Sequence, residues 1–318
     1  MSSHSLATRT EKTEPAPART RRTRNRGWKP RLAPLSILRL LILFGFGIFC
    51  LVPLIWLLLT PTKTDAAILG DFPLSFGTFD RLAAAWQHLT AYSGGILFKW
   101  MLNSVYYSAG SLVITIVTGL LAGYAMATMR FPGRKTILTL TLLSMVMPAT
   151  VTVLPLFLEI NAVGLTNTAA SVILPASFFP FGVYLAFVYF STSVPKELLE
   201  AARLDGCSEF RAFISVVLPI AKPLIGLLAF FSFVANWNNY FLPYVMLSDQ
   251  DAYNLPVGLG ALMAGSPALH PERGGSFLPI TRPEVALAGL IVVIPIALLF
   301  LIFQRYLVRG ILSGSVKS

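Results

Sequence analysis

Charged residues are scarce in this sequence. Asp, Glu, Lys and Arg make up 12% of the 318 residues, and hydrophobic residues make up 55%. Soluble domains carry about twice that charged fraction. The composition therefore excludes an ordinary soluble domain and predicts an integral membrane protein.

Residues and motifs typical of enzymes and metal sites are also missing. The two cysteines, Cys50 and Cys207, are far apart in the sequence and form no disulfide framework or Cys-x-x-Cys metal pair. The three histidines, His4, His88 and His270, show no metal-ligand spacing. No GxxxxGK(S/T), HExxH or GxSxG motif occurs. We therefore expect no catalytic residue, metal or cofactor in this chain.

Long stretches without charge delimit the predicted membrane spans. A spanning helix needs roughly 20 apolar residues. Six stretches that lack Asp, Glu, Lys and Arg are long enough: 40–62, 100–129, 136–158, 160–195, 223–248 and 285–304. A seventh, 252–271, has too many Gly, Pro and polar residues to face lipid. The sequence thus predicts an all-α polytopic membrane protein with six transmembrane helices.

Lys and Arg are distributed unevenly between the two sides of these spans. Residues 1–39, the loops after the second and fourth spans, and the C-terminal tail hold 20 of the 25 Lys and Arg residues. Because cytoplasmic loops carry the excess of positive charge, we expect both termini in the cytoplasm. The Arg-, Thr- and Pro-rich start predicts a disordered basic tail over 1–35, followed by a transmembrane domain over 36–318. No folded module accompanies this tail, so we expect no nucleic-acid partner.

None of the six stretches contains an ionisable Asp, Glu, Lys or Arg. Ion-driven carriers usually hold the coupling ion with such a side chain, although some sodium-coupled carriers use carbonyls and hydroxyls instead. The absence therefore disfavours a secondary carrier that works alone. A membrane-embedded enzyme would need a cluster of His, Asp or Cys that the sequence lacks. If the chain moves a solute uphill, we expect another subunit to supply the energy.

Small residues and prolines are expected to shape the spans. Gly119, Gly123 and Ala127 recur at four-residue spacing, which lets two helices approach closely. The third and fourth spans contain prolines, which bend helices and free a carbonyl. Outside the spans, the sequence predicts a short helix near 78–88 and a long Gly- and Pro-rich loop over 248–283.

A charged, helix-forming segment, Pro195–Pro219, lies between two apolar runs. Pro195 can occupy the start of a helix, Gly206 ends that helix in a left-handed conformation, and a second helix follows. The resulting helix–turn–helix lies on the predicted cytoplasmic side, where Glu200 and Asp205 offer carboxylates to a partner protein. The alternative is an amphipathic helix lying on lipid, which anionic headgroups disfavour because they repel carboxylates.

The spacing in this segment resembles the EAA motif of permease subunits of ABC importers. Glu200-Ala201-Ala202 is followed after three residues by Gly206, and nine residues later by Val216, one residue and Leu218-Pro219. The family motif has Ile where this chain has Val216. The segments GYAMATMRFPGRK, LNSVYYS, NWNNYFLPYVML and FQRYLVRGILSGSVKS resemble carbohydrate permeases of the maltose-transporter type. The resemblance covers about 36–318 and fails over 1–35 and about 262–282.

The resemblance implies a fold, a coupling loop and a set of partners. The fold would be that of a type I ABC importer permease. The loop 193–221 would couple the chain to a separate ATPase through seven residues: Glu200, Ala201, Ala202, Asp205, Gly206, Leu218 and Pro219. The partners would be a second homologous permease, two ATP-binding cassette subunits that hold ATP and Mg, and an extracytoplasmic solute-binding protein. The complex would lie in the cytoplasmic membrane of a bacterium or archaeon.

The fifth predicted span combines amides with aromatic rings in Asn236, Trp237, Asn238, Asn239 and Tyr240. Amides in hydrocarbon are costly unless they are paired or face water. Amides can bind sugar hydroxyls and aromatic rings can stack on sugar C–H faces, so these residues are candidates for a translocation pathway. Hydrogen bonding between helices is the alternative. The resemblance makes a carbohydrate the expected substrate, with a polyol or glycerol phosphate as the alternative.

Overall fold

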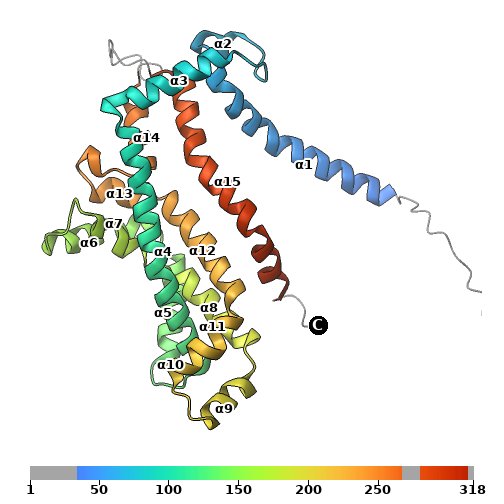
Figure 1. Cartoon of the computed structure of the whole chain (residues 1–318), viewed down its shortest axis with the longest axis vertical. Coiled ribbons are helices and arrows are strands. Elements are labelled where there is room, and N and C mark those ends of the chain that lie inside the picture. Colours follow the sequence, from blue (N-terminus) through green and yellow to red (C-terminus); the bar gives the residue numbers. More distant parts are fainter. Residues whose placement is uncertain (1–33, 267–279, 314–318) are drawn as a thin grey trace, which may run out of the picture. The chain divides into compact units, whose positions relative to one another are not determined.

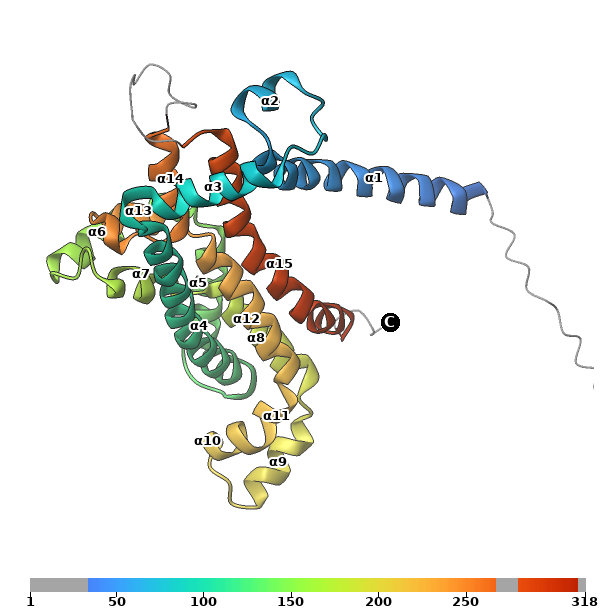
Figure 2. The same cartoon turned by 45° about the horizontal axis from the view of Figure 1, so that its top comes forward.

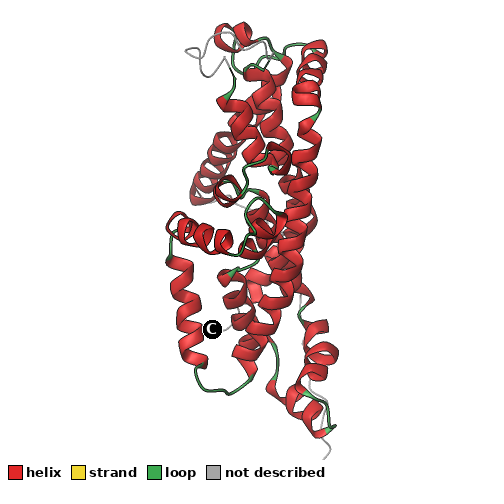
Figure 3. Cartoon of the chain, turned by 90° about the vertical axis from the view of Figure 1, so that its left-hand side faces the viewer, coloured by secondary structure: helices red, strands yellow, loops and turns green. Residues whose placement is uncertain are grey.

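A computed structural model of the chain describes residues 34–266 and 280–313, with side chains over 36–266 and 280–304. Every regular element within these ranges is a helix (Figure 3). The chain divides into two compact units, Met1–Cys50 and Leu51–Ser318, and helix α1 (Pro34–Leu59) runs from the first into the second. The predicted disordered tail, except for its last residues, and most of the segment 262–282, where the family resemblance fails, lie outside the described residues.

Four helical segments among the described residues are long and apolar enough to cross a membrane. They are Ser36–Thr62, α4 (Ile96–Thr128), the segment formed by α7 (Ala169–Ala176) and α8 (Pro180–Ser193), and Arg282–Gln304 within α15 (Arg282–Ser313). Two bent helix pairs pass the same test together. Counted as one span each, they give six, and the predicted all-α polytopic fold is confirmed.

The third predicted span is not one continuous helix. It consists of α5 (Arg134–Val146) and α6 (Ala149–Ala162), which meet at an angle of 109°. Pro148 explains the break, because a proline pushes the residue before it out of the helical conformation. That residue, Met147, has an extended backbone with φ of −68° and ψ of 126°.

The fifth predicted span is also interrupted. The segment α10 (Glu209–Ala212), η3 (Phe213–Val217, a π-helical turn) and α11 (Leu218–Ile220) meets α12 (Lys222–Trp237) at 81°. Beyond a break at 238–240, the chain continues as α13 (Phe241–Met246).

The remaining helices are short and connect the spans. They are η1 (Thr60–Thr62), α2 (Asp65–Gly70), α3 (Phe79–Ala91), η2 (Tyr92–Gly94), α9 (Lys196–Leu204), η4 (Gln250–Ala252) and α14 (Leu255–Ala264). Helix α3 confirms the short helix predicted near 78–88. Helix α14 has 10 residues, too few to cross a membrane, which agrees with the rejection of 252–271 as a span.

Glycine brings α4 and α8 into close contact. A Cβ atom at Gly123 would lie 2.4 Å from Ala186 Cβ, and one at Gly119 would lie 3.9 Å from the Gly182 carbonyl carbon. The predicted packing role of this small-residue stripe is confirmed at both glycines. Helix α12 packs beside them (Figures 1 and 2). The three helices share a hydrophobic cluster with the loop 193–221.

The first half of α4 holds the segment 250–255 by side-chain hydrogen bonds. Trp100 Nε1 donates to Gln250 O at 2.8 Å, and Tyr107 Oη donates to Ala252 O at 2.8 Å. Between them, the Asn103 amide donates to the carbonyls of residues 251 and 253, and the Ser104 hydroxyl accepts from the backbone N–H of residue 255. Helix α4 therefore connects this segment with the loop 193–221 at its other end.

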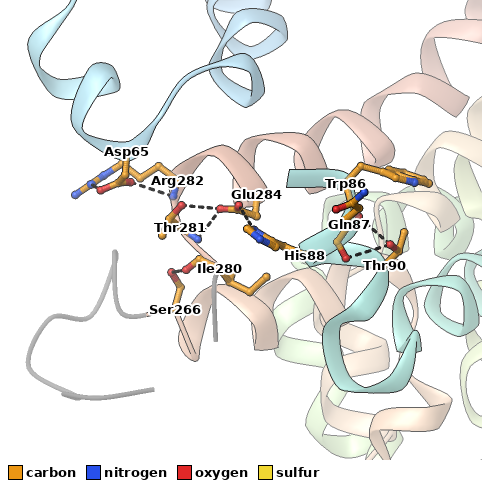
Figure 4. A network of polar contacts seen from close by, with 10 residues as sticks. All are labelled: Asp65, Trp86, Gln87, His88, Thr90, Ser266, Ile280, Thr281, Arg282 and Glu284. Carbon is orange, nitrogen blue, oxygen red and sulfur yellow. Dashed lines mark hydrogen bonds and ion pairs between the residues drawn. The ribbon is translucent and has the colours of Figure 1, made fainter. Parts of the chain in front are cut away.

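A buried carboxylate ties α3 to the start of α15 (Figure 4). Glu284 Oε1 lies 2.8 Å from His88 Nδ1 of α3. Its Oε2 accepts hydrogen bonds from the backbone N–H and the hydroxyl of Thr281, the residue just before α15, and so satisfies one of the free N–H groups at the helix start. Arg282 is paired with Asp65 of α2 at 2.6 Å. These contacts fasten α2, α3 and α15 together.

Candidate functional site

The loop 193–221 forms a helical hairpin (Figures 1 and 2). Helix α9 carries Glu197 in its first turn and Arg203 in its last, the arrangement that the helix dipole favours. Gly206 turns the chain with a φ of +75°, a conformation that glycine adopts readily. Ser208 then caps α10 by accepting a hydrogen bond from Arg211 N at 3.3 Å. The predicted helix–turn–helix is confirmed.

An ion pair joins the two limbs of this hairpin. Arg203 Nε donates to Glu209 Oε1 at 2.7 Å. This hydrogen bond lowers the pKa of the Glu209 carboxyl from its ordinary value, and it raises the pKa of the Arg203 guanidinium. Because a lowered carboxyl pKa favours the charged form, the ion pair is retained as the pH falls to the ordinary pKa of a Glu carboxyl.

The motif residues divide between the surface and the core. Five of them are exposed: Glu200, Ala201, Asp205, Gly206 and Pro219. Leu218 is half-buried, and Ala202 is buried in a cluster with Leu199 and Phe213. Ala202 therefore packs α9 against the hydrophobic cluster. Its side chain is not available to a partner protein in this conformation.

Two large apolar side chains on the same hairpin are exposed. Leu204 ends α9 and is 90% exposed, and Phe210 in α10 is 67% exposed. They flank the Gly206 turn on a hairpin that also carries charged side chains, and exposed apolar groups in such a place can form a contact surface for another protein. Sequence reasoning missed both, because Leu and Phe carry no signal in an apolar chain until their exposure is known.

A cavity of about 560 Å³ lies beside α9, at the ends of α4 and α8. Four basic residues and two carboxylates line it: Arg130, Arg134, Lys196, Arg203, Glu200 and Glu209. A lining of both signs is complementary to a protein surface that also carries both signs.

Trp237 lies inside the helix bundle. It is 3% exposed, its indole donates to Val292 O of α15 at 2.9 Å, and its ring stacks on Phe233 with a centroid distance of 5.4 Å. This is the interhelical contact that the sequence left open as the alternative. We therefore do not include Trp237 in the proposed translocation pathway.

Of the other four candidates, Asn236 lies in the last turn of α12, and Asn238, Asn239 and Tyr240 form the break between α12 and α13. The Asn236 amide donates to Ser232 Oγ, and the Asn238 amide donates to Val234 O, both within α12. The carbonyl of Asn239 accepts from the Asn254 amide. Asn238 and Tyr240 are exposed, and the Tyr240 ring stacks on Tyr244. Because irregular backbone at membrane depth is tolerated only where it is buried in protein or lines a water-filled space, we expect the break at 238–240 to lie in one of these two environments.

Among the residues that the structure describes, no group of three or more His, Cys, Asp or Glu is placed to hold a metal ion. The candidate site is therefore composed of the hairpin, the cavity beside it and the break at 238–240. The hairpin can bind another protein, and the amides and aromatic ring at the break can contact a polar solute.

Comparisons with solved structures identify the fold. A chain of a bacterial ABC transporter involved in the import of the acidic polysaccharide alginate superposes with a TM-score of 0.72 and 21% sequence identity. The match covers 86% of this chain and 96% of that chain. This chain therefore has the fold of that ABC transporter chain.

Comparisons with sequences identify the family. The chain is 34% identical over 224 residues to the arabinooligosaccharides transport system permease protein AraQ of Halalkalibacterium halodurans. This match covers 70% of this chain and 75% of the relative. It is 30% identical over 280 residues to the diacetylchitobiose uptake system permease protein NgcG of Streptomyces coelicolor, with 87% of each chain covered. Residues 116–313 match the family described as binding-protein-dependent transport system inner membrane component. The chain belongs to this family, as its motif from Glu200 to Pro219 predicts.

Proposed function

We propose that this chain is the permease subunit of an ATP-driven importer that moves a carbohydrate across the cytoplasmic membrane. The observation that carries the proposal is the exposed hairpin with the spacing of the EAA motif, in a chain without a GxxxxGK(S/T) motif. The names of two relatives specify arabinooligosaccharides and diacetylchitobiose, which supports an oligosaccharide as the substrate.

The hairpin, which we call the coupling loop (193–221), docks on a separate ATPase. Leu204 and Phe210 are its apolar anchors, because large side chains that become fully buried contribute most of the affinity of a protein interface. Glu200 and Asp205 add charges that select the orientation of the partner. Gly206 and the Arg203–Glu209 pair hold the two limbs in a fixed geometry, so the loop is ordered before it binds.

The coupling loop and both termini lie in the cytoplasm. This assignment follows from the 20 Lys and Arg residues that share one side of the membrane. The importer also contains a second homologous permease, a second copy of the ATPase, and an extracytoplasmic solute-binding protein that delivers the carbohydrate. The description of the family as binding-protein-dependent supports the last of these partners.

The break at 238–240 lines the translocation pathway, together with Asn236. Asn238 and Tyr240 are exposed there, and an amide beside an aromatic ring suits a sugar. Asn239 positions the break through its carbonyl, which the Asn254 amide holds at 2.7 Å. The predicted fifth span supplies no Asp, Glu, Lys or Arg to the pathway, which agrees with an uncharged substrate better than with glycerol phosphate.

Purification of the tagged chain from its own membrane in mild detergent tests the proposal. We expect an ATPase and a second permease to be recovered with the wild type. Leu204→Asp places a charge on the exposed anchor, and we expect it to lower recovery of the ATPase at least about tenfold, which corresponds to a loss of roughly 1.4 kcal/mol of binding. Recovery of the second permease should not change.

Leu69→Asp is the matched control, because Leu69 in α2 is also exposed but lies far from the coupling loop in the sequence. It should leave recovery of both partners unchanged. A wild-type chain that purifies alone, and that still moves sugar in vesicles without ATP, would establish a secondary carrier instead.

A further inference from the structure

Glu209 connects the coupling loop to a helix that is distant in the sequence. Its Oε1 accepts from Arg203, and its Oε2 accepts a hydrogen bond from Tyr124 Oη of α4 at 3.2 Å. Tyr124 and Glu209 are separated by 85 positions. The polypeptide itself joins the loop only to α8 and α12, so α4 can respond to the loop only through non-covalent contacts.

The Tyr124 ring is fixed in place by two aromatic neighbours. Its centroid lies 6.0 Å from that of Phe190 in α8, in an edge-on arrangement, and 5.0 Å from that of Phe213 in η3. The residue is 2% exposed. The ring is therefore held by packing, while the hydroxyl reaches out of the hydrophobic cluster to the Glu209 carboxylate.

Phe213 of the loop packs directly against the Tyr124 ring of α4. Apolar contacts of this kind are non-directional. The hydrogen bond from Tyr124 Oη to the Glu209 carboxylate is directional, and at 3.2 Å it is longer than the roughly 2.5–3.0 Å usual for O–H···O bonds. The Tyr124–Glu209 bond is therefore suited to make α4 follow a displacement of the loop along the helix axis.

Helix α4 is suited to carry that displacement to its other end. It has 33 residues and no proline, so it is about 50 Å long at 1.5 Å per residue. Four of its side chains hold the backbone of the segment 250–255 through hydrogen bonds: Trp100, Asn103, Ser104 and Tyr107. A movement of α4 must therefore move this segment or break those bonds.

We infer that Glu209 and Tyr124 are positioning residues that transmit displacement of the coupling loop to α4, and through α4 to the segment 250–255 on the opposite side of the membrane. The inference rests on the proposed docking of an ATPase at the coupling loop. Helix α4 receives the displacement, although it is not adjacent to the loop in the chain. The transmission depends on the hydroxyl group of Tyr124.

The test measures how fast a cysteine placed beside the segment 250–255 is labelled. Ser248 is exposed two residues before Gln250, and Ser248→Cys can be introduced into a chain in which Cys50→Ser and Cys207→Ala remove the native thiols. The complete transporter is placed in lipid nanodiscs. Labelling by a water-soluble maleimide is followed without nucleotide, and again after trapping with ATP, Mg²⁺ and vanadate.

We expect trapping to change the labelling rate several-fold in the wild-type background. Tyr124→Phe keeps the ring but removes the hydroxyl, and it should abolish this response while the ATPase remains bound and active. Tyr106→Phe is the matched control: it makes the same change on α4, at an exposed tyrosine whose hydroxyl has no hydrogen bond within the described part of the chain. It should leave the response intact.

The outcomes separate this inference from the proposed function. A response that survives in Tyr124→Phe, with an ATPase bound, overturns the role of this bond and leaves the proposed function standing. A wild-type complex that hydrolyses ATP but shows no change at position 248 overturns transmission to the far segment. A wild-type chain that binds no ATPase overturns both.

Discussion

Adjacent residues at the end of α12 have opposite environments. Trp237 is buried against α15, whereas Asn238 is exposed and its amide contacts only the carbonyl of Val234 in its own helix. Because the Asn238 amide makes one hydrogen bond, it can exchange this bond for one to a sugar hydroxyl with little change in free energy. The two residues should therefore respond differently to substitution.

We predict that Asn238→Ala lowers carbohydrate uptake several-fold without changing the amount of assembled transporter. Loss of one hydrogen bond to a substrate costs about 0.5–1.5 kcal/mol, which sets the expected size of the effect. Uptake of a labelled panel that contains arabino-oligosaccharides and diacetylchitobiose measures it. Asn161→Ala, at an exposed asparagine near the end of α6, is the control. Equal uptake by both variants would remove Asn238 from the pathway.

Sequence reasoning identified the residue types of the site but not their orientation. The motif spacing located the hairpin, and Glu200 and Asp205 are exposed as its role requires. The same reasoning could not tell that Ala202 is buried, nor that Leu204 and Phe210 are exposed. It also could not select Tyr124, because its partner Glu209 lies 85 positions away and no local pattern links them.

The packing of α4 on α8 is decided by a glycine at the point of closest approach. A side chain at position 123 would overlap Ala186, with 2.4 Å between the two Cβ atoms. At position 289 of α15, by contrast, a Cβ atom would meet nothing within 4 Å. The two glycines therefore have different reasons for being present, and the same substitution should have opposite effects.

We predict that Gly123→Ala destabilises the purified chain and that Gly289→Ala does not. Overpacking at a close helix contact costs about 1–3 kcal/mol, whereas replacing an unhindered helical glycine by alanine gains up to about 1 kcal/mol. Thermal unfolding of both variants in the same detergent measures the difference. A Gly123→Ala variant as stable as the wild type would show that α4 and α8 separate easily.

The positions of the membrane helices could be predicted from the sequence more closely than the positions of the breaks within them. Charge-free stretches marked the membrane segments, and Pro148 explains the bend between α5 and α6 by a local rule. The break at 238–240 contains no Pro or Gly. Pro243 lies four residues after Asn239 and cannot donate to the Asn239 carbonyl. The Asn254 amide donates to that carbonyl instead, and this tertiary contact is the part that the local sequence does not reveal.

At the scale of the whole molecule, the proposed orientation places the coupling loop and the segment 61–99 on opposite sides of the membrane. Asp205 and Asp71 are exposed and belong to these two parts. We predict that an impermeant maleimide added to intact cells labels Asp71→Cys and not Asp205→Cys, in a background without native cysteines. Inside-out vesicles should reverse the pattern. Labelling of Asp205→Cys in intact cells would overturn the orientation.

The bend between α5 and α6 has a consequence for how the protein is made. Helix α5 has 13 residues, about 20 Å at 1.5 Å per residue, which is shorter than the roughly 30 Å hydrocarbon core. Helix α6 packs its Val153 against Leu242 and Met246 of α13, residues that the ribosome adds some 90 positions later. The third predicted span therefore lacks this packing surface when it first enters the bilayer. We expect the third span to reach its final packed position only after the fifth predicted span has been synthesised. The order in which the spans are translated would then differ from the order in which they pack.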